Sequence, residues 1–450
     1  MSGLPKGWVE ATLEDLCEFN PKHDPETDRG TTVSFIPMPA VDDETGAIVD
    51  RSAIRPLSEV WKGYTHFANA DVIFAKITPC MENGKIAVAR DLENGMACGS
   101  TEFHVLRSKG AVEPDFVWRF LRQRSYRQIA ERSMTGAVGQ RRVPKPFLEG
   151  TTLPLPPLAE QKRIVAKLDA LDAKSARART ELARIETLVS RYKQAVLSKA
   201  FSGELVGLVP AATEKPHDLC WDLPLGWRWV AFGDAVEIAS NLVNPDTIPE
   251  LPHIAPDNIE SGTARLLPFK TIGEDGVISA KHRFFSGQIL YSKIRPYLRK
   301  AVIANFDGAC SADMYPLSPR DVLSARYLLQ WLVSEQFTHF AVEHQGRTVL
   351  PKINQTALNK TPLPLPPLAT QHEIVRRIES AFAKIDRLAK EAKRALELVG
   401  RLDEAILAKA FRGELVPQNE NDEPAEHLLA RIRAERDKAP KARRGRQAKS

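Results

Sequence analysis

The sequence is poor in cysteine and contains no long apolar run, and both absences narrow its class. Five cysteines are scattered through 450 residues without a C-x-x-C pair, so neither a disulfide framework nor a zinc site is indicated. No apolar run approaches the roughly 20 residues that a membrane-spanning helix needs. The N-terminal MSGLPKGWVE lacks the basic and apolar regions of a signal peptide. We therefore expect a protein of the reducing cytoplasm that makes no membrane contact.

Catalytic motifs are missing as well. The sequence has no G-x-x-x-x-G-K-[ST] phosphate loop, no G-x-S-x-G elbow and no H-E-x-x-H pair. The D/N-P-P-Y/F tetrad of adenine methyltransferases is also absent, because neither Asn20-Pro21 nor Asn244-Pro245 is followed by a second proline. We therefore expect no catalytic centre, no metal site and no cofactor bound by this chain.

The composition, with 43% hydrophobic and 27% charged residues, is that of an ordinary globular protein, and the length favours two or three domains. The net charge of +6 comes from the C-terminal end. Residues 431–450 contain nine Lys and Arg against Glu435 and Asp437, a local charge of +7, which leaves −1 for the rest. Any argument for nucleic-acid binding must therefore rest on local clusters of charge.

An internal duplication is the clearest feature of the sequence. LPLPPLAEQ at 153–161 recurs as LPLPPLATQ at 363–371, and AVLSKAFSGELV at 195–206 recurs as AILAKAFRGELV at 405–416, both 210 residues later. LPKGW at 4–8 recurs as LPLGW at 223–227, and DVIFAKITPC pairs more loosely with QILYSKIRPY. Each copy thus consists of a Gly-Trp motif, a variable segment, a proline repeat and a long helix.

Apolar residues alternate at spacings of four and three after each proline repeat, which predicts two long helices with a coiled-coil seam. The alternative is ordinary helical core, but the matching register of both copies argues against it. A pseudo-two-fold axis would make the helices antiparallel and put one variable segment at each end. The seam residues that we expect to form the coiled coil or dock subunits are Ile164, Leu168, Leu171, Leu182, Ile185, Val189, Ile374, Ile378, Ile385, Leu388, Val399 and Leu402.

The variable segments are predicted to be mixed α and β. VSFIPMP, DVIFAKI, KIAVAR and TEFHVLR are typical of strands, whereas DFVWRFLRQRSYRQIAERS and SARYLLQWLVSEQFTHFAVEH have helical spacing. The predicted fold class is α+β. The expected domains are two target-recognition domains (1–152 and 223–362), two proline hinges with long helices (153–206 and 363–416), a linker (207–222) and a basic tail (417–450). P-x-x-P segments can also be polyproline ligands, but here both copies run directly into the helices.

Two local basic patches favour contact with DNA, because backbone phosphates attract such clusters and arginine can pair with guanine edges. Residues 107–145 carry ten Lys and Arg against three acids, and residues 281–300 carry six and none. The alternative is a solvated helix face or a strand with its aromatic residues in the core. The candidate DNA-binding residues are Lys76, Arg124, Arg127, Arg141, Arg142, Lys145, Lys281, Arg283, Lys293, Arg295, Arg299, Lys300, Arg347 and Lys352.

With LPLPPLAEQ-KRIVAKLDAL and LPLPPLATQ-HEIVRRIESA, each ending in a K-A-F-x-G-E-L helix, the chain resembles the specificity subunits of type I restriction-modification systems. The resemblance covers nearly the whole chain, twice in the same order. One departure is Thr370, which stands where the first copy has Glu160 and which we expect to weaken an interaction at the helix start.

The resemblance implies that each target-recognition domain reads one half of a bipartite site in double-stranded DNA. It also implies that the long helices set the spacer and dock two modification subunits, which bind S-adenosylmethionine and methylate adenine. Restriction subunits that use ATP and Mg²⁺ would complete the complex. Because the two variable segments differ in sequence, the expected target is asymmetric.

Two other classes of protein explain part of the sequence. A fragment of a combined restriction and methylation polypeptide is disfavoured by the missing catalytic motifs and by a chain that opens at Met1 with its own Gly-Trp motif at 4–8. A non-catalytic coiled-coil scaffold without specific DNA binding leaves two large segments with basic patches unexplained. Methyltransferase and translocase genes beside this gene would favour the specificity subunit, and their absence would favour the scaffold.

Overall fold

The computed structural model describes residues 3–137, 139–343 and 351–438 and divides into two compact units. Unit 1 comprises residues 1–180 and 395–450, and unit 2 comprises residues 181–394. Two long helices, α7 (Leu158–Phe201) and α13 (Leu368–Ala410), contribute to both units. Each unit therefore contains one variable segment and one end of each long helix.

Unit 1 contains two four-stranded sheets and a two-stranded ribbon. The first sheet has the order β2-β9-β6-β7, with strands Cys17–Phe19, Phe103–Ser108, Val72–Ala75 and Ile86–Val88. The second has the order β4-β3-β8-β5, with strands Ile54–Pro56, Thr32–Ile36, Met96–Gly99 and Thr65–Ala68. In the ribbon, β1 (Val9–Thr12) pairs with β10 (Thr152–Leu155). The strand β6 is buried at every position, so both of its faces are covered.

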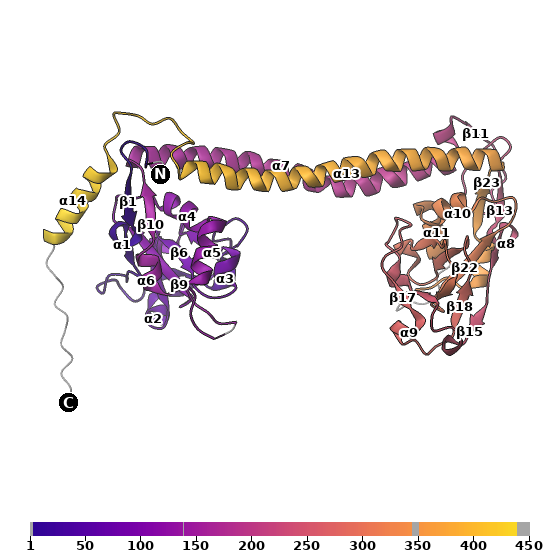
Figure 1. Ribbon diagram of the computed structural model, residues 1–450, viewed down its shortest axis with the longest axis horizontal. Coiled ribbons are helices and arrows are strands. Elements are labelled where there is room, and N and C mark those ends of the chain that lie inside the picture. The colour runs from indigo at the N-terminus through magenta and orange to yellow at the C-terminus, as the bar shows by residue number, and fades with distance from the viewer. Residues whose placement is uncertain (1–2, 138, 344–350, 439–450) are drawn as a thin grey trace. The chain divides into compact units, whose positions relative to one another are not determined.

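Helices cover the first sheet of unit 1. The helix α4 (Pro114–Arg122) begins with a proline, whose missing N–H costs nothing there, and it buries Phe116, Val117 and Leu121. The extended backbone of Gln123 separates α4 from α5 (Arg124–Arg132). Figure 1 shows α4 beside β6 and α5 next to α3. The other helices of unit 1 are α1 (Leu13–Leu16), α2 (Leu57–Val60), α3 (Cys80–Asn83), α6 (Lys145–Glu149) and α14 (Ala425–Lys438).

Unit 2 follows a similar plan. One sheet has the order β14-β22-β19-β20, with strands Val236–Ile238, Met314–Pro319, Ile289–Ser292 and Ala301–Ile303. A five-stranded sheet has the order β15-β18-β21-β16-β17, with strands Leu242–Val243, Lys281–Phe284, Gly308–Cys310, Pro252–Ile254 and Lys270–Thr271. The remaining pairs are β13 (Arg228–Ala231) with β23 (Pro362–Leu365) and β11 (Pro210–Ala211) with β12 (Leu223–Pro224). The helices are α8 (Phe232–Ala235), α9 (Ile272–Asp275), α10 (Ala325–Leu332), α11 (Glu335–Glu343) and α12 (Gln355–Lys360).

The sheet order shows that the duplication extends to the fold. The order β2-β9-β6-β7 in unit 1 corresponds to β14-β22-β19-β20 in unit 2, and the second sheet of each unit contains one parallel pair, β3 with β8 or β16 with β21. The mixed α and β prediction is therefore confirmed. Strands predicted at VSFIPMP, DVIFAKI, KIAVAR and TEFHVLR are present as β3, β6, β7 and β9.

In unit 1 the two long helices pack together in opposite chain directions. Leu168, near the start of α7, belongs to the same core cluster as Ala410, at the end of α13. Farther along α7, the Ser175 hydroxyl donates to a carboxylate oxygen of Asp403 at 2.6 Å. Increasing residue numbers on α7 therefore meet decreasing numbers on α13.

The same holds within unit 2. Lys193 Nζ lies 2.6 Å from Asp386 Oδ1, and Leu197 shares a core cluster with Ile378. The prediction that the long helices pack on each other is thus confirmed in each unit. No helix in the described part of the chain combines the length and apolarity that crossing a bilayer requires.

Two residues of the predicted seam do not lie between the helices. Leu388 is 58% exposed and Leu402 is 55% exposed, so their assignment to the seam is wrong. A straight helix has 3.6 residues per turn, and a strict seven-residue repeat drifts around it. Asp403, the neighbour of Leu402, makes the interhelical contact instead. The other ten predicted seam residues are buried or half-buried.

The proline repeat is partly strand and not only a hinge. Leu153 and Leu155 lie in β10, Leu363 and Leu365 lie in β23, and all four are buried. Since β10 pairs with β1 and β23 with β13, each proline repeat is joined to the strand that follows a Gly-Trp motif. The two repeated motifs therefore form one structural element in each unit.

The C-terminal segment, expected to be a basic tail, folds onto unit 1. The backbone N–H of Ala425 donates to the carbonyl of Gly7 at 3.0 Å, and Leu429 is buried in the core of unit 1. Arg433 forms an ion pair of 2.7 Å with Asp15. Residues 417–435 thus belong to the folded unit, and residues 439–450 lie outside the described residues.

Candidate nucleic-acid interface

In unit 1, three charged residues meet where the central strand β6 ends. The backbone N–H of Lys76 donates to Glu102 O at 2.9 Å, and its carbonyl accepts from Val143 N at 2.8 Å. Arg142 forms a β-bridge with Ile77, and its guanidinium donates to both carboxylate oxygens of Glu102 at 2.8 and 2.9 Å. Lys76, Glu102 and Arg142 form the strand-end cluster of unit 1.

Unit 2 repeats this arrangement at the end of β19. The backbone N–H of Lys293 donates to Asp313 O, and its carbonyl accepts from Ile353 N, both at 3.0 Å. Lys352 occupies the place of Arg142, because it forms a β-bridge with Ile294. We name Lys293, Asp313 and Lys352 the strand-end cluster of unit 2. Two predicted cations in each unit, about 60 residues apart in sequence, are thus brought together.

The electrostatics of the two clusters differ in one respect. In unit 1 the hydrogen bonds from Arg142 hold the pKa of Glu102 below its usual value, so this guanidinium is already oriented by a carboxylate. In unit 2, burial lowers the pKa of Lys293, the charge of Asp313 raises it in part, and the nearby charge of Lys352 lowers it again. Each cluster has two cations for one carboxylate and can therefore attract a DNA phosphate.

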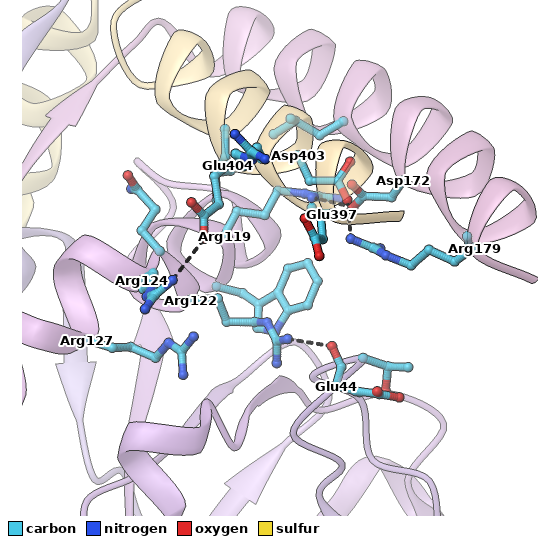
Figure 2. Close-up of a pocket in the computed structure, with 18 residues that line it drawn as sticks. Glu44, Arg119, Arg122, Arg124, Arg127, Asp172, Arg179, Glu397, Asp403 and Glu404 are labelled. Carbon is cyan, nitrogen blue, oxygen red and sulfur yellow. Dashed lines mark hydrogen bonds and ion pairs between the residues drawn. The ribbon is translucent and has the colours of Figure 1, made fainter. Parts of the chain in front are cut away.

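Arg124 and Arg127 line a cleft of about 790 Å³ in unit 1. The Arg124 guanidinium is 3.9 Å from Glu404 on α13. Arg127 donates to the Glu82 carbonyl, and burial lowers its pKa. Figure 2 shows these arginines on one side of the cleft, with Asp172 of α7 and Asp403 and Glu404 of α13 labelled across it. The acids of the long helices partly balance this basic patch.

Two further arginines of the patch at 107–145 have structural roles. Arg119 is buried and binds Asp169 at 2.5 Å and Asp172 at 2.8 Å, which fastens α4 to α7. Arg122 donates to the Gly84 carbonyl at 2.8 Å, and burial lowers its pKa to about 10. The patch is therefore not one continuous surface for DNA.

Arg141 and Lys145 are partly exposed beside acidic neighbours. Arg141 lies 3.9 Å from Glu82 and 4.0 Å from Glu131. Lys145 pairs with Glu149, one helical turn later, at 2.6 Å. Both contacts leave part of each side chain in solvent, so their role in DNA binding stays a prediction.

In the second patch, the burial of Lys281 argues against the prediction. Its strand, β18, is paired on both sides, with β15 and β21. Lys281 is 5% exposed, and its Nζ donates to the hydroxyl and the carbonyl of Ser279 at 2.7 and 2.8 Å. Burial also lowers its pKa. A side chain held in this way is not available to a phosphate, so the assignment of Lys281 to the DNA surface is corrected.

The remaining cations of the second patch surround a short turn. Arg295 and Arg299 flank the turn at 296–298 with left-handed backbones at φ 48° and 51°. Arg295 is exposed, whereas Arg299 pairs with Glu335 at 3.2 Å. Lys300 Nζ donates to the Pro256 carbonyl at 2.7 Å. Arg283 stacks over the Phe285 ring. Arg347, a predicted DNA-binding residue beyond this patch, lies outside the described residues.

The aromatic residues of this patch divide between core and surface. Phe284 and Tyr291 are buried in the core, which agrees with the alternative of a strand whose aromatic residues lie in the core. Phe285 and Tyr297 are about half exposed. Arg283 lies 5.5 Å from the Phe285 ring. An exposed ring beside an arginine offers a flat surface for a base or sugar.

Two further arginine–aromatic pairs lie in unit 1 and were not predicted from the sequence. Arg29 lies 3.2 Å from the centre of the Trp61 ring, and Arg55 lies 4.3 Å from that of Phe35. Arg55 is exposed on the edge strand β4. These pairs join residues 20 to 32 positions apart, so no local run of basic residues marks them.

A buried cluster of His23, His66 and Cys98 has its possible ligand atoms within 4.8 Å of one another. Both ring nitrogens of His66 are engaged, one accepting from His23 N at 3.3 Å and the other bonded to Trp61 O at 2.9 Å. His23 Nε2 is bonded to Ala97 O. Burial lowers the pKa of both histidines. The two histidines are therefore neutral and form hydrogen bonds with backbone groups, which explains the cluster without a metal ion.

The long helices carry exposed apolar side chains outside the contact between them. Those of unit 1 are Leu396, Leu398 and Leu402, and those of unit 2 are Leu188, Tyr192, Leu368 and Leu388. Exposed apolar side chains mark surfaces for other proteins where they form a patch.

Comparison with known proteins identifies the family. The family described as "Type I restriction modification DNA specificity domain" matches residues 5–187 and 260–398. The chain belongs to this family. The specificity subunit of the type I restriction enzyme EcoDI from Escherichia coli is 42% identical over 304 residues, which are 63% of this chain and 68% of the relative. The EcoEI specificity subunit from Escherichia coli is 26% identical across 91% of this chain and 83% of its own length.

Solved structures of type I systems share the fold. The HsdS subunit from Thermoanaerobacter tengcongensis has a TM-score of 0.64 and 25% identity, over 92% of this chain and 98% of that one. A chain from a structure of type I R-M complex assembly and conformational transition has a TM-score of 0.72 and 24% identity, over 92% and 100%. Membership of the DNA specificity family, predicted from the duplicated motifs, is thus confirmed.

Proposed function

We propose that this chain is the DNA-reading subunit of a type I restriction-modification complex, in which each variable segment reads one half of a bipartite site. The repeated strand-end cluster supports this proposal most directly. Two cations and one carboxylate recur with the same backbone hydrogen bonds in units whose other residues differ. Such repeated cations would hold DNA phosphates and fix the register, while the dissimilar loops around them read bases.

The dissimilarity of the two variable segments supports an asymmetric target. Unit 1 adds Arg29 and Arg55 with their aromatic partners, and unit 2 adds Arg283 with Phe285. Side chains that differ in this way would select different bases in the two half-sites.

The long helices would act as an antiparallel coiled coil related by a pseudo-two-fold axis. Their length would set the spacer between half-sites, and their exposed leucines would dock two modification subunits. The opposite chain directions in both units and the apolar residues outside the interhelical contact support this role.

The chemistry would reside in the partner subunits, and this chain would be a non-catalytic cytoplasmic component. S-adenosylmethionine would bind to the modification subunits, and ATP and Mg²⁺ would serve the restriction subunits. What this chain supplies is the position of the DNA, through phosphate contacts and base-edge hydrogen bonds.

The test is co-expression with the neighbouring methyltransferase gene, followed by single-molecule sequencing for N6-methyladenine. One asymmetric bipartite motif, lost when either 1–152 or 223–362 is deleted, is the expected result. A stable complex without any methylated motif would leave a coiled-coil scaffold without specific DNA binding, and would contradict the proposal.

A further inference from the structure

The two Gly-Trp motifs meet the ends of the long helices in the same way. In unit 1, Gly413 packs so closely on Pro5 that a Cβ at Gly413 would lie 2.4 Å from the proline ring. In unit 2, Gly203 packs on Pro224, and a Cβ at Gly203 would lie 2.3 Å from the proline ring. The surfaces around the two motifs are therefore equivalent and can be compared residue by residue.

In unit 1 the C-terminal segment covers this surface. The N–H of Ala425, the first residue of α14, donates to Gly7 O at 3.0 Å. Ala111 is 1% exposed there, and Pro157 is buried. Two acidic residues complete the contact: Glu420 pairs with Lys6 at 3.3 Å, and Asp422 pairs with Arg163 at 2.7 Å.

In unit 2 the equivalent surface is open. It is a groove of about 350 Å³ lined by Gly226, Arg228, Asp321, Val322, Leu365, Pro366, Pro367 and Leu368, and we name these residues the unit 2 groove. Val322 is the counterpart of Ala111, because its carbonyl accepts from Gln371 as that of Ala111 accepts from Gln161. Val322 is 46% exposed, and Leu368 is 42% exposed. Leu225, the counterpart of Lys6, is 93% exposed beside it. The linker at 207–222 contributes no residue to the groove.

We propose that the unit 2 groove is a docking site for an amphipathic helix of a partner protein, seated as α14 is seated in unit 1. The first N–H of that helix would donate to Gly226 O, and an aliphatic residue one turn later would cover Val322 and Leu368. A basic residue about eight positions along would meet Asp234. This aspartate is the counterpart of Asp15, which pairs with Arg433 of α14.

The charges around the groove argue against a second copy of this chain as the occupant. Leu225 stands where Lys6 holds Glu420, and Glu373 stands where Arg163 holds Asp422. Glu373 is already bonded to Arg376 and Arg377. The segment 420–433 of a second copy would therefore find neither Lys6 nor Arg163 at the equivalent positions. The groove instead fits a helix that has an apolar residue in place of Glu420 and no acid in place of Asp422.

Peptide binding to the full chain tests this docking site, and because the assay contains no DNA its outcome does not depend on the proposed function. The probes are two fluorescein-labelled peptides of residues 417–435, one native and one carrying Glu420→Leu and Asp422→Asn. Fluorescence anisotropy should give a Kd at least tenfold lower for the altered peptide. Val322→Glu in the full chain should raise that Kd at least tenfold, whereas Ile278→Glu, at a residue 92% exposed outside the groove, should leave it unchanged.

A second variant keeps the proposal testable if Val322→Glu does not fold by circular dichroism. Leu225→Lys with Glu373→Arg places the charges of Lys6 and Arg163 at the two equivalent positions and should reverse the preference toward the native peptide. Equal affinities for both peptides, or binding that survives Val322→Glu in a folded protein, would overturn the proposal. So would a dimer in sedimentation that Val322→Glu abolishes, because a second copy would then cover the groove.

Discussion

Gln161 and Gln371 make the same three hydrogen bonds in the two units. Each glutamine is fully buried in the first turn of a long helix. Its oxygen accepts from the backbone N–H at the start of α4 or α10, and its Nε2 donates to two carbonyl oxygens, all within 2.8–3.0 Å. The partners are Glu113, Ala111 and Pro156 for Gln161, and Ser324, Val322 and Pro366 for Gln371. This glutamine ties the variable segment of each unit to its helix.

Replacing either glutamine by alanine should destabilise its unit by roughly 2–4 kcal/mol, because backbone groups are left buried without partners. Urea denaturation with hydrogen exchange of the two units measures this effect for Gln161→Ala and Gln371→Ala. Lys162→Ala, at an exposed neighbouring position, is the control. A loss no larger than that of the control would contradict this role of the glutamines.

Glu160 should make unit 1 less stable as the pH rises. Burial raises the pKa of Glu160 above its usual value, although Trp8 donates to it at 3.1 Å. Because the folded state then holds the proton more tightly than the unfolded state, stability falls as the pH rises through the raised pKa. Glu160→Gln should raise the Tm at pH 8 and leave it unchanged at pH 4. A lower Tm at pH 8 would show that the ionised carboxylate is favourable.

His66 should make unit 1 less stable as the pH falls, which is the opposite of the effect expected from Glu160. Burial lowers the pKa of His66 to about 4 from 6.5, so below pH 6.5 the unfolded chain takes up a proton that the folded chain does not. Stability should therefore fall by about 3 kcal/mol between pH 6.5 and pH 4. Urea midpoints across this range should vary less for His66→Gln than for the native chain. The exposed His372 supplies the control, and an unchanged slope in His66→Gln would contradict the prediction.

Lys293 and Lys352 should strengthen DNA binding by the same factor for every DNA sequence. If each holds one phosphate, alanine at either position should weaken binding roughly threefold and lower the salt dependence of log K by about one. Anisotropy titrations of the complex with target and random DNA between 50 and 200 mM salt measure both effects. The buried Lys281→Met is the matched control. A loss for Lys281→Met equal to that for Lys293→Ala would contradict the assignment of the strand-end cluster.

Repetition in the sequence predicted the parts of the fold that repeat in space. The recurring LPLPPL and Gly-Trp motifs indicated two units, and they now appear as paired strands. Lys76 and Lys293 lie at equivalent positions of the loosely matching DVIFAKI and QILYSKI. Their partners Glu102 and Asp313 were missed, because pairing between strands distant in sequence brings them there.

Burial and register could not be read from local patterns. Lys281 lies in a basic run, yet its strand is enclosed by two neighbours. Leu388 and Leu402 follow the heptad spacing, but helical drift turns them to solvent. The docking of α14 depends on Gly7 and Asp15 at the other end of the chain. Each of these outcomes depends on tertiary packing and not on the composition of the segment.

The most direct test of the central claim is a chimera in which residues 1–152 also replace residues 223–362. The chimera is co-expressed with the methyltransferase, and its methylated sites are read by single-molecule sequencing. If each segment reads one half-site, the asymmetric target becomes an inverted repeat of the first half-site. A chimera that methylates the original asymmetric target would show that the variable segments do not carry the specificity.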